Sequence, residues 1–258
     1  MKSLIIRSIS GLTLVILTIF AIKLGNIYLY GYVFLLSIIG ISEFYDAVKN
    51  INIKPIKLIG YIACVIFLLN SIGILWAKVS YIFIFVSILL LVCYFTNKKV
   101  KFSDVIATFF SIFYIPFLLQ HIIYLSNGIY IWLVFIIAWG TDTFAYVFGM
   151  LFGKHKLCPS LSPKKTIEGS IGGIIGAIGL TYLYIKYLEI DAYWAFLLIA
   201  FIGSIVAQIG DLTASKIKRV TGIKDFGFIM PGHGGVLDRF DSILFIAPYT
   251  YYISKLFL

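Results

Sequence analysis

The sequence predicts an all-α, polytopic membrane protein, a transmembrane helical bundle of about nine spans with the N-terminus in the cytoplasm. Composition is the first observation behind this class. Of 258 residues, 61% are hydrophobic and only 12% are charged, whereas soluble domains carry about 25% charged residues. So few charged side chains could not cover the outside of a water-soluble fold of this size. Lipid is therefore the expected solvent for much of the surface.

Long apolar segments are the second observation. A spanning helix needs about 20 mostly apolar residues, within a range of about 17–25. The first segment follows Lys2 and Arg7 but has no small-residue cleavage site after it, so we expect an anchor rather than a signal peptide. The predicted spans are residues 4–22, 26–48, 57–74, 79–96, 103–125, 129–151, 167–187, 192–215 and 236–257.

The basic residues concentrate on one side of this bundle, in every second connection between the predicted spans. With the N-terminus inside, 17 of the 21 lysines and arginines fall on the cytoplasmic side, as the positive-inside rule expects. A wrong helix count before any loop would scramble this pattern, so it supports both count and orientation. Because the basic residues form no continuous face, the net charge of +10 does not indicate a nucleic-acid partner. The residues on the outer side are Lys23, Lys78, Lys186 and Lys255.

The character of the chain changes within one predicted membrane domain, residues 1–258. Residues 1–128 are mainly scaffold helices with short basic loops, whereas in residues 129–258 the loops lengthen and charges enter the helices. We expect the catalytic region in this second part, at the cytoplasmic interface. Glu43 and Asp46 end the second span, where snorkelling explains them. An active-site role for Glu43 stays open.

Two carboxylates stand out in the predicted helices. Asp142 lies well inside an apolar segment, where a carboxylate costs at least about 2.5–3.5 kcal/mol on insertion scales. We therefore expect it to face a polar cavity, a cation or a partner, with a structural hydrogen bond as the alternative. Asp211 follows Gly210 at the cytoplasmic end of the eighth span, and Ser215 shares its helix face. An interfacial cap is the alternative for Asp211.

The segment that follows combines cations with glycines. Lys218, Arg219 and Lys224 could neutralise several phosphate charges. Glycines after Pro231 free the backbone to approach an anion. Taken singly, these features also suit a membrane-topology signal and a turn. Their combination within about thirty residues favours a phosphate site.

Two acids close this segment. Asp238 and Asp241 lie three positions apart at the start of a predicted helix, so both point to one side. Acids at a helix start also interact with its dipole. Beside a basic cluster, however, two carboxylates indicate Mg²⁺ that bridges a polyphosphate.

The loop before the seventh predicted span carries a second basic set. It includes Lys164 and Lys165 and lies on the same predicted side, so both loops could meet one nucleotide. Positive-inside lysines explain the charges equally well. The glycine-rich stretch 169–176 lacks the Gly-Lys-Ser/Thr ending of a phosphate-binding loop. Its small-xxx-small spacing predicts close helix packing instead.

Taken together, these motifs resemble the phosphatidate cytidylyltransferase family, also called CDP-diacylglycerol synthases. The resemblance is strong over residues 139–242, while the first half matches only in hydropathy. Asp142, the runs 152–156 and 162–166 and the Gly210-Asp211 pair contribute to it. The signature elements are Ser215, Lys218-Arg219, Lys224-Asp225, Pro231, His233-Gly234-Gly235, Asp238-Arg239 and Asp241.

The resemblance implies an enzyme of phospholipid biosynthesis, a nucleotidyltransferase that makes CDP-diacylglycerol and pyrophosphate from CTP and phosphatidic acid. It implies Mg²⁺, held by Asp211 and Asp238, and leaves a second cation open. The implied catalytic residues are Asp211, Asp238, Asp241, His233 and Asp142. The implied substrate-binding residues are Lys164, Lys165, Ser215, Lys218, Arg219, Lys224, Arg239, Gly234 and Gly235.

Membrane lipids are the expected surroundings, in the inner membrane of the cell with the site facing the cytoplasm, and a homodimer is left open. Two other activities stay in play at this point. A CTP-dependent lipid kinase, such as a polyprenol kinase, would release CDP instead of pyrophosphate. A cation-coupled transporter would use Asp142 and Asp211 as a relay, although the inverted repeats typical of transporters are not seen. A membrane scaffold without catalysis would leave the Asp and Gly pattern unexplained.

Overall fold

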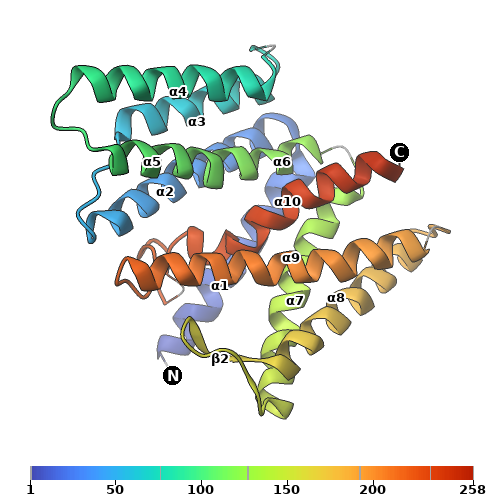
Figure 1. Ribbon diagram of the computed structural model, residues 1–258. Helices are drawn as coiled ribbons and strands as arrows, with labels where there is room; N and C mark the ends of the chain where they lie inside the picture. Colours follow the sequence, from blue (N-terminus) through green and yellow to red (C-terminus); the bar gives the residue numbers. More distant parts are fainter. Residues whose placement is uncertain (1, 76, 127, 192, 233, 258) are drawn as a thin grey trace. The chain divides into compact units, whose positions relative to one another are not determined.

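The computed structural model describes residues 2–75, 77–126, 128–191, 193–232 and 234–257. Helices make up most of these residues (Figure 1), which confirms the predicted all-α class. The chain forms two compact units, and each is described by itself. Unit 1 contains Met1–Ser126 and Val220–Arg239, and unit 2 contains Asn127–Arg219 and Phe240–Leu258.

Six helical stretches among the described residues are long and apolar enough to cross a membrane. Within the hydrocarbon core each backbone N–H and C=O must be satisfied inside its own segment, and a helix achieves this. The polytopic membrane prediction is thereby confirmed. Two shorter apolar helices, Ile9–Leu24 and Lys57–Ser71, accompany the six. The six are Asn26–Lys49, Val79–Thr96, Phe102–Tyr124, Tyr130–Phe152, Ile167–Tyr187 and Tyr193–Val220.

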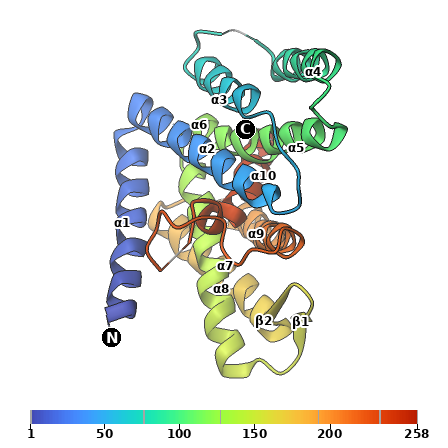
Figure 2. The same cartoon turned by 90° about the vertical axis from the view of Figure 1, so that its left-hand side faces the viewer.

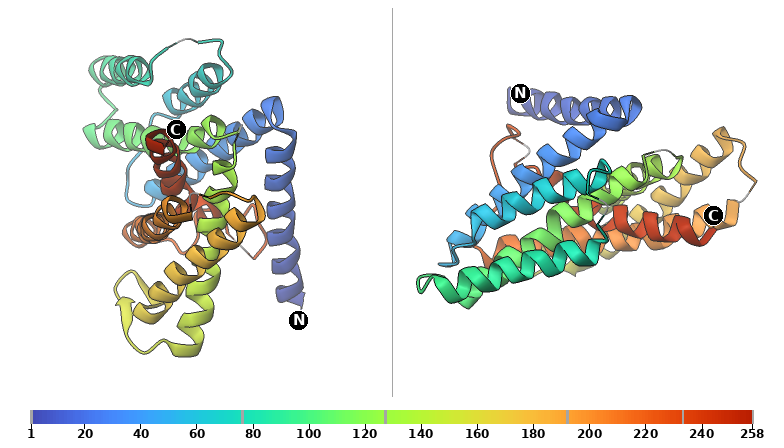
Figure 3. Two further views of the ribbon diagram at one scale, coloured as in Figure 1. Left: turned by 90° about the vertical axis from the view of Figure 1, so that its right-hand side faces the viewer. Right: turned by 90° about the horizontal axis from the view of Figure 1, so that it is seen from above.

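Unit 1 is built from the helices of the first half of the chain. Figure 1 shows α3, α4 and the rod of α5, η1 and α6 beside one another, and Figure 3 shows the same helices from above. The rod contains one π-helical turn, at Pro116, because proline has no N–H for the α-helical ladder. The helices are α1 (Lys2–Leu24), α2 (Asn26–Lys49), α3 (Lys57–Ser71), α4 (Val79–Thr96), α5 (Phe102–Ile112), η1 (Phe113–Phe117) and α6 (Leu118–Tyr124).

Unit 2 contains most of the second half of the chain. Its helices are α7 (Tyr130–Phe152), α8 (Ile167–Tyr187), α9 (Tyr193–Val220) and α10 (Leu237–Phe257), of which α10 begins in unit 1. Each of the nine predicted spans overlaps one helix or, for residues 103–125, the α5–η1–α6 rod.

The glycine-rich stretch lies where α7 and α8 touch most closely. A Cβ built on Gly173 would lie 2.8 Å from the Thr141 carbonyl oxygen, and one on Gly169 would lie 2.7 Å from that of Ala145. Only a glycine allows the two backbones to approach this far. The predicted packing role of residues 169–176 is therefore confirmed.

A short β-hairpin joins α7 to α8, where the sequence analysis expects only a loop. Its strands are β1 (Lys156–Cys158) and β2 (Ser162–Thr166), which pair antiparallel. Figure 2 shows the hairpin beside the ends of α7 and α8. The Thr166 hydroxyl then caps α8 by accepting the backbone N–H of Gly169 at 3.1 Å. The hairpin is an addition to the predicted helical bundle.

Candidate active site

Helix α9 is the centre of the polar site in unit 2. Gly210 lies against α10, because a Cβ there would be 2.6 Å from the Asp241 carbonyl oxygen. On the side of α7, the buried Thr141 hydroxyl donates to the Ser204 hydroxyl at 2.8 Å. Close packing on both sides thus places Asp211, one residue after Gly210, next to the polar residues of α7 and α10.

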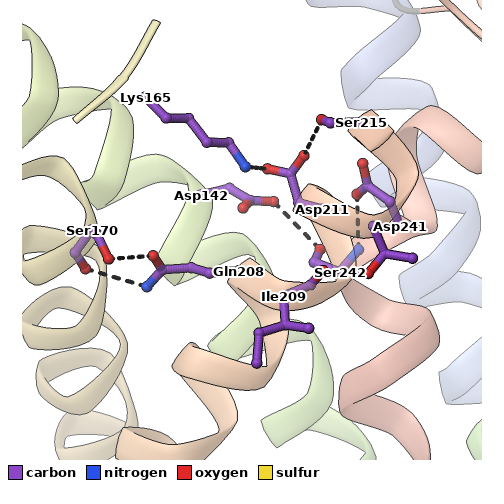
Figure 4. Close-up of polar contacts among 10 residues, drawn as sticks. Asp142, Lys165, Ser170, Gln208, Ile209, Asp211, Ser215, Asp241 and Ser242 are labelled. Carbon is purple, nitrogen blue, oxygen red and sulfur yellow. Dashed lines mark hydrogen bonds and ion pairs between the residues drawn. The ribbon is translucent and has the colours of Figure 1, made fainter. Parts of the chain in front are cut away.

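Three carboxylates from three helices gather here (Figure 4). Asp142 comes from α7, Asp211 from α9 and Asp241 from α10. Ser242 connects two of these helices, since its hydroxyl lies 3.5 Å from Asp142 Oδ2. Its backbone N–H donates to Asp241 Oδ1 at 2.8 Å. The structure therefore brings together three of the five predicted catalytic residues.

Cations and a hydroxyl accompany these acids. Lys165, from β2, forms an ion pair with Asp211, and both side chains are about one quarter exposed. Ser215 lies one turn after Asp211 in α9, and its hydroxyl donates to Asp211 Oδ1 at 3.4 Å. The predicted shared helix face of Asp211 and Ser215 is confirmed. Lys165 also brings the hairpin before α8 next to a residue of α9.

Asp241 is the most enclosed of the three acids, with only 8% of its surface exposed. The negative charges of Asp211 and Asp142 repel a charge on Asp241, while the positive charge of Lys218 attracts it. A cation near Asp211 and Asp142 would reduce this repulsion of a charge on Asp241. The local field therefore favours a positively charged ligand or ion.

The hairpin that carries Lys165 is fixed to the helices at two points. Glu168, in the first turn of α8, accepts the backbone N–H groups of Lys154 and His155 at 3.1 and 3.2 Å. At the end of α9, Arg219 Nε donates to the Leu161 carbonyl at 3.1 Å. Arg219 thus has a structural contact in addition to its predicted phosphate role. These contacts hold Lys165 over Asp211.

The segment between α9 and α10 belongs mostly to unit 1. Asp238, only 7% exposed, accepts with Oδ2 the backbone N–H groups of Phe226 at 2.7 Å and Gly235 at 2.9 Å. Gly234 has a φ of +84°, and a Cβ there would lie 2.6 Å from the same oxygen. Asp238 therefore organises the loop that precedes it, a role that the sequence analysis did not predict.

Glu43 is buried, and this corrects the snorkelling interpretation. Only 5% of its surface is exposed, and its carboxylate accepts the backbone N–H groups of Val236 and Leu237. Asp46, one turn further along α2, is exposed beside Lys49, as snorkelling predicts. Local sequence gave little signal for the Glu43 contact, because its partners lie 193 and 194 positions away.

The remaining predicted residues are distributed over both units. Lys164 lies exposed on β2 in unit 2, while Lys224 and Arg239 are exposed in unit 1. His233 lies outside the described residues. Asp211 and Asp238, the pair predicted to hold Mg²⁺, belong to unit 2 and unit 1 respectively. The joint role of these two acids stays a prediction.

Comparison with known proteins supplies the family. The model of the cytidylyltransferase family matches residues 5–257. The chain belongs to the cytidylyltransferase family. The phosphatidate cytidylyltransferase of Staphylococcus epidermidis is 34% identical over 251 residues, which cover 94% of this chain and 96% of the relative. That of Staphylococcus haemolyticus is 50% identical over 125 residues, 48% of each chain.

This membership confirms the resemblance expected from the spaced motifs. It makes the protein an enzyme of the nucleotidyltransferase class. The match also extends over the first half of the chain, where the residues alone showed only a likeness in hydropathy. Neither a lipid kinase nor a transporter is favoured by these relatives.

Proposed function

We propose that the protein is a phosphatidate cytidylyltransferase, which forms CDP-diacylglycerol and pyrophosphate from CTP and phosphatidic acid. The observation that carries the proposal is the cluster of Asp142, Asp211 and Asp241 with Lys165 and Lys218, in a chain matched almost throughout by the cytidylyltransferase family. Acids that favour a cation, beside lysines that favour phosphate, suit a metal-bound nucleoside triphosphate.

The reaction needs no nucleophile from the protein. A phosphate oxygen of phosphatidic acid attacks the α-phosphorus of CTP, and the bond from that phosphorus to the bridging oxygen breaks as pyrophosphate leaves. The protein's task is to position two anions against each other and to neutralise their charge. Lys165 and Lys218 in unit 2 would bind phosphate oxygens, and Lys164 would lie over the nucleotide from β2. Lys224, Arg239 and His233 keep their predicted phosphate roles.

The donor set in unit 2 fits Mg²⁺. Carboxylate oxygens are the ligands that this ion prefers, and it commonly takes one or two of them together with substrate phosphates and water. Among the described residues, no three acid, histidine or cysteine side chains converge closely enough to hold a metal ion by themselves. We therefore assign Asp211, with Asp142 and Asp241 beside it, to a cation that arrives with the triphosphate. When bound, the cation would withdraw electron density from the phosphoryl oxygens.

The topology proposed for this function has nine spans and a cytoplasmic N-terminus. In addition to the six long apolar stretches, α1, α3 and α10 would cross the membrane. The hairpin that carries Lys165 and the end of α9 that carries Lys218 would then face the cytoplasm, where soluble CTP can meet a lipid headgroup. The basic charge of these two segments supports this orientation. In a bacterial cell the membrane would be the inner one.

The decisive experiment measures products. Purified protein in detergent receives CTP, Mg²⁺ and phosphatidic acid, and both pyrophosphate and CDP are quantified. We expect pyrophosphate release that depends on phosphatidic acid, and a loss of about 100-fold or more in Asp211→Asn, which removes one charge from the cation site. Release of CDP instead would establish a lipid kinase and contradict the proposal.

Two further results would change the proposed function or the proposed cation site. No product from folded wild-type protein would rule out cytidylyl transfer. Wild-type activity in Asp211→Asn would leave the reaction in place and remove the cation site from the acidic cluster. Asp238→Asn is assayed in parallel, and its thermal unfolding is measured as well. A lower unfolding temperature would show that the loop contacts described above are lost. A loss of activity at an unchanged unfolding temperature would indicate a metal role.

A further inference from the structure

Glu43 lies in α2, in the half of the chain that the sequence analysis describes as scaffold. It nevertheless binds the end of residues 226–237, the segment before α10 that carries part of the signature. Its Oε1 accepts the backbone N–H of Val236, and its Oε2 accepts that of Leu237, both at 2.9 Å. Leu237 is the first residue of α10, so these are two of the backbone donors that an α-helix leaves without an internal partner. Both carboxylate oxygens are therefore engaged at the start of α10.

The glycines of the loop are fitted to this carboxylate. A Cβ on Gly227 would lie 2.5 Å from Glu43 Oε1, and a Cβ on Gly235 would collide with both carboxylate oxygens. The loop thus contacts Glu43 near its beginning, at Gly227, and again at its end, at Gly235 and Val236. Gly235 is a predicted substrate-binding residue. The contact with Glu43 already requires a glycine at this position, because any larger residue would collide with the carboxylate.

Two buried acids therefore hold one short segment, residues 226–237. Asp238 connects Phe226 with Gly235, and Glu43 holds Val236 and Leu237. Both acids are at least nine-tenths buried. Within the segment, Met230 N–H donates to the Gly234 carbonyl at 3.0 Å, which closes a turn. The segment carries four of the twelve signature residues, and its flanks carry Lys224 and Arg239.

We infer that Glu43 is a positioning residue for residues 226–237, which carry predicted substrate-binding residues. This inference rests on the proposed function. By holding the end of residues 226–237 at the start of α10, Glu43 fixes the backbone between Lys224 and Arg239. The negative charge matters as well as the shape. A carboxylate accepts two N–H groups at once and interacts favourably with the positive end of the helix dipole. A glutamine of equal size would turn an NH₂ group toward one of these donors.

The chain supplies a matched control in the same unit. Asp104, in α5, is 3% exposed and also accepts two backbone N–H groups, that of Lys54 at 2.7 Å and that of Lys101 at 2.9 Å. It differs from Glu43 in what it holds, because Lys54 and Lys101 are not part of the signature segment. Asp104→Asn should therefore cost stability as Glu43→Gln does, without disturbing residues 226–237.

The experiment combines hydrogen exchange with kinetics on the full-length protein in detergent. In Glu43→Gln we expect faster amide exchange in peptides that cover residues 226–237. We also expect a fall in kcat/KM of about 10–100-fold, the usual cost of removing a group that orients a functional residue. Asp104→Asn should exchange normally in that segment and keep the wild-type kcat/KM. Glu43→Asp, which retains the charge, should recover part of the activity.

The outcomes separate this inference from the proposed function. Unchanged exchange at residues 226–237 in Glu43→Gln would overturn the positioning role, whatever the reaction is. Faster exchange with wild-type kcat/KM would overturn its importance for activity, as would an equal kinetic loss in Asp104→Asn. A wild-type protein without cytidylyl transfer would sink the proposed function, while the exchange result would still decide whether Glu43 holds the loop. If Glu43→Gln does not fold, the same two readouts are taken on Glu43→Asp, and wild-type values for both would reject the inference.

Discussion

At the scale of single residues, the pairing of Lys165 with Asp211 is the most informative contact of the site. Lysine is a compact cation on a flexible stem and suits phosphate as well as carboxylate. In the structure its ammonium group neutralises one member of an acidic cluster. When a metal ion binds with a triphosphate, the Asp211 carboxylate could bind the metal ion and the Lys165 ammonium group could bind a phosphate. Lys165 is therefore suited to change partners when substrate binds.

Its neighbour Lys164 allows this role to be tested. The two lysines are adjacent on β2, but Lys164 is exposed whereas Lys165 is half-buried against Asp211. We expect Lys165→Met to lower kcat by about 100-fold, as the loss of one pre-organised charge does, and Lys164→Met to lower it much less. Steady-state kinetics with CTP and phosphatidic acid measure both. Equal losses would show that the loop contributes only its general charge.

At the scale of elements, the contact of α7 with α8 controls where Asp142 lies. Gly173→Ala would place a methyl group 2.8 Å from the Thr141 carbonyl and 3.1 Å from the Ala145 side chain. Forcing the helices apart should cost about 1–3 kcal/mol of stability. Because Asp142 follows Thr141 in α7, activity should fall too. Thermal unfolding in detergent, with the cytidylyl transfer assay, measures both effects.

Gly179 is the control on the same helix. Nothing lies within 4 Å of a Cβ at this position, and alanine favours a helix over glycine by about 1 kcal/mol. Gly179→Ala should therefore unfold at the same or a higher temperature and keep full activity. A similar loss of stability in both variants would mean that glycine serves the helix itself rather than its packing.

The sequence predicted those elements that depend on local sequence patterns. Long apolar runs give helices in lipid, so the helix ranges follow from hydropathy, and small-xxx-small spacing identifies the packed face of α8. The β-hairpin escaped prediction because strands as short as Lys156–Cys158 leave no periodic pattern. Glu43 escaped because its contact depends on tertiary pairing across most of the chain, which no spacing within α2 reveals.

The family resemblance named Asp142, Asp211, Asp238 and Asp241 as catalytic residues, but it did not show how their surroundings differ. Asp238 and Asp241 look equivalent in sequence, three positions apart in α10. In the structure Asp238 binds backbone N–H groups of its own loop, while Asp241 faces the charges of Asp211 and Asp142. One acid therefore stabilises the loop and the other belongs to the acidic cluster, and this difference depends on residues contributed by other parts of the chain.

At the scale of the whole molecule, the orientation in the membrane decides whether CTP can reach the site. The proposed topology, nine spans with a cytoplasmic N-terminus, would put Lys99 and Lys164 inside and Lys78 and Lys186 outside. Single cysteines at these positions, in a chain whose Cys64, Cys93 and Cys158 are replaced by serine, report the side directly. A membrane-impermeant maleimide applied to intact cells should label the outer pair only, and permeabilised cells should show labelling of all four.

Lys255 is the position that tests the last crossing. It lies near the end of α10, which carries both Asp238 and Asp241 at its start and is not among the six long apolar stretches. If α10 crosses, a cysteine at Lys255 reacts in intact cells, and both acids begin the helix at the cytoplasmic face. Protection of this cysteine until the cells are permeabilised would leave eight crossings or a re-entrant α10. The acids at its start would then need a different route to CTP, because charged groups are tolerated at membrane depth only where protein or water surrounds them.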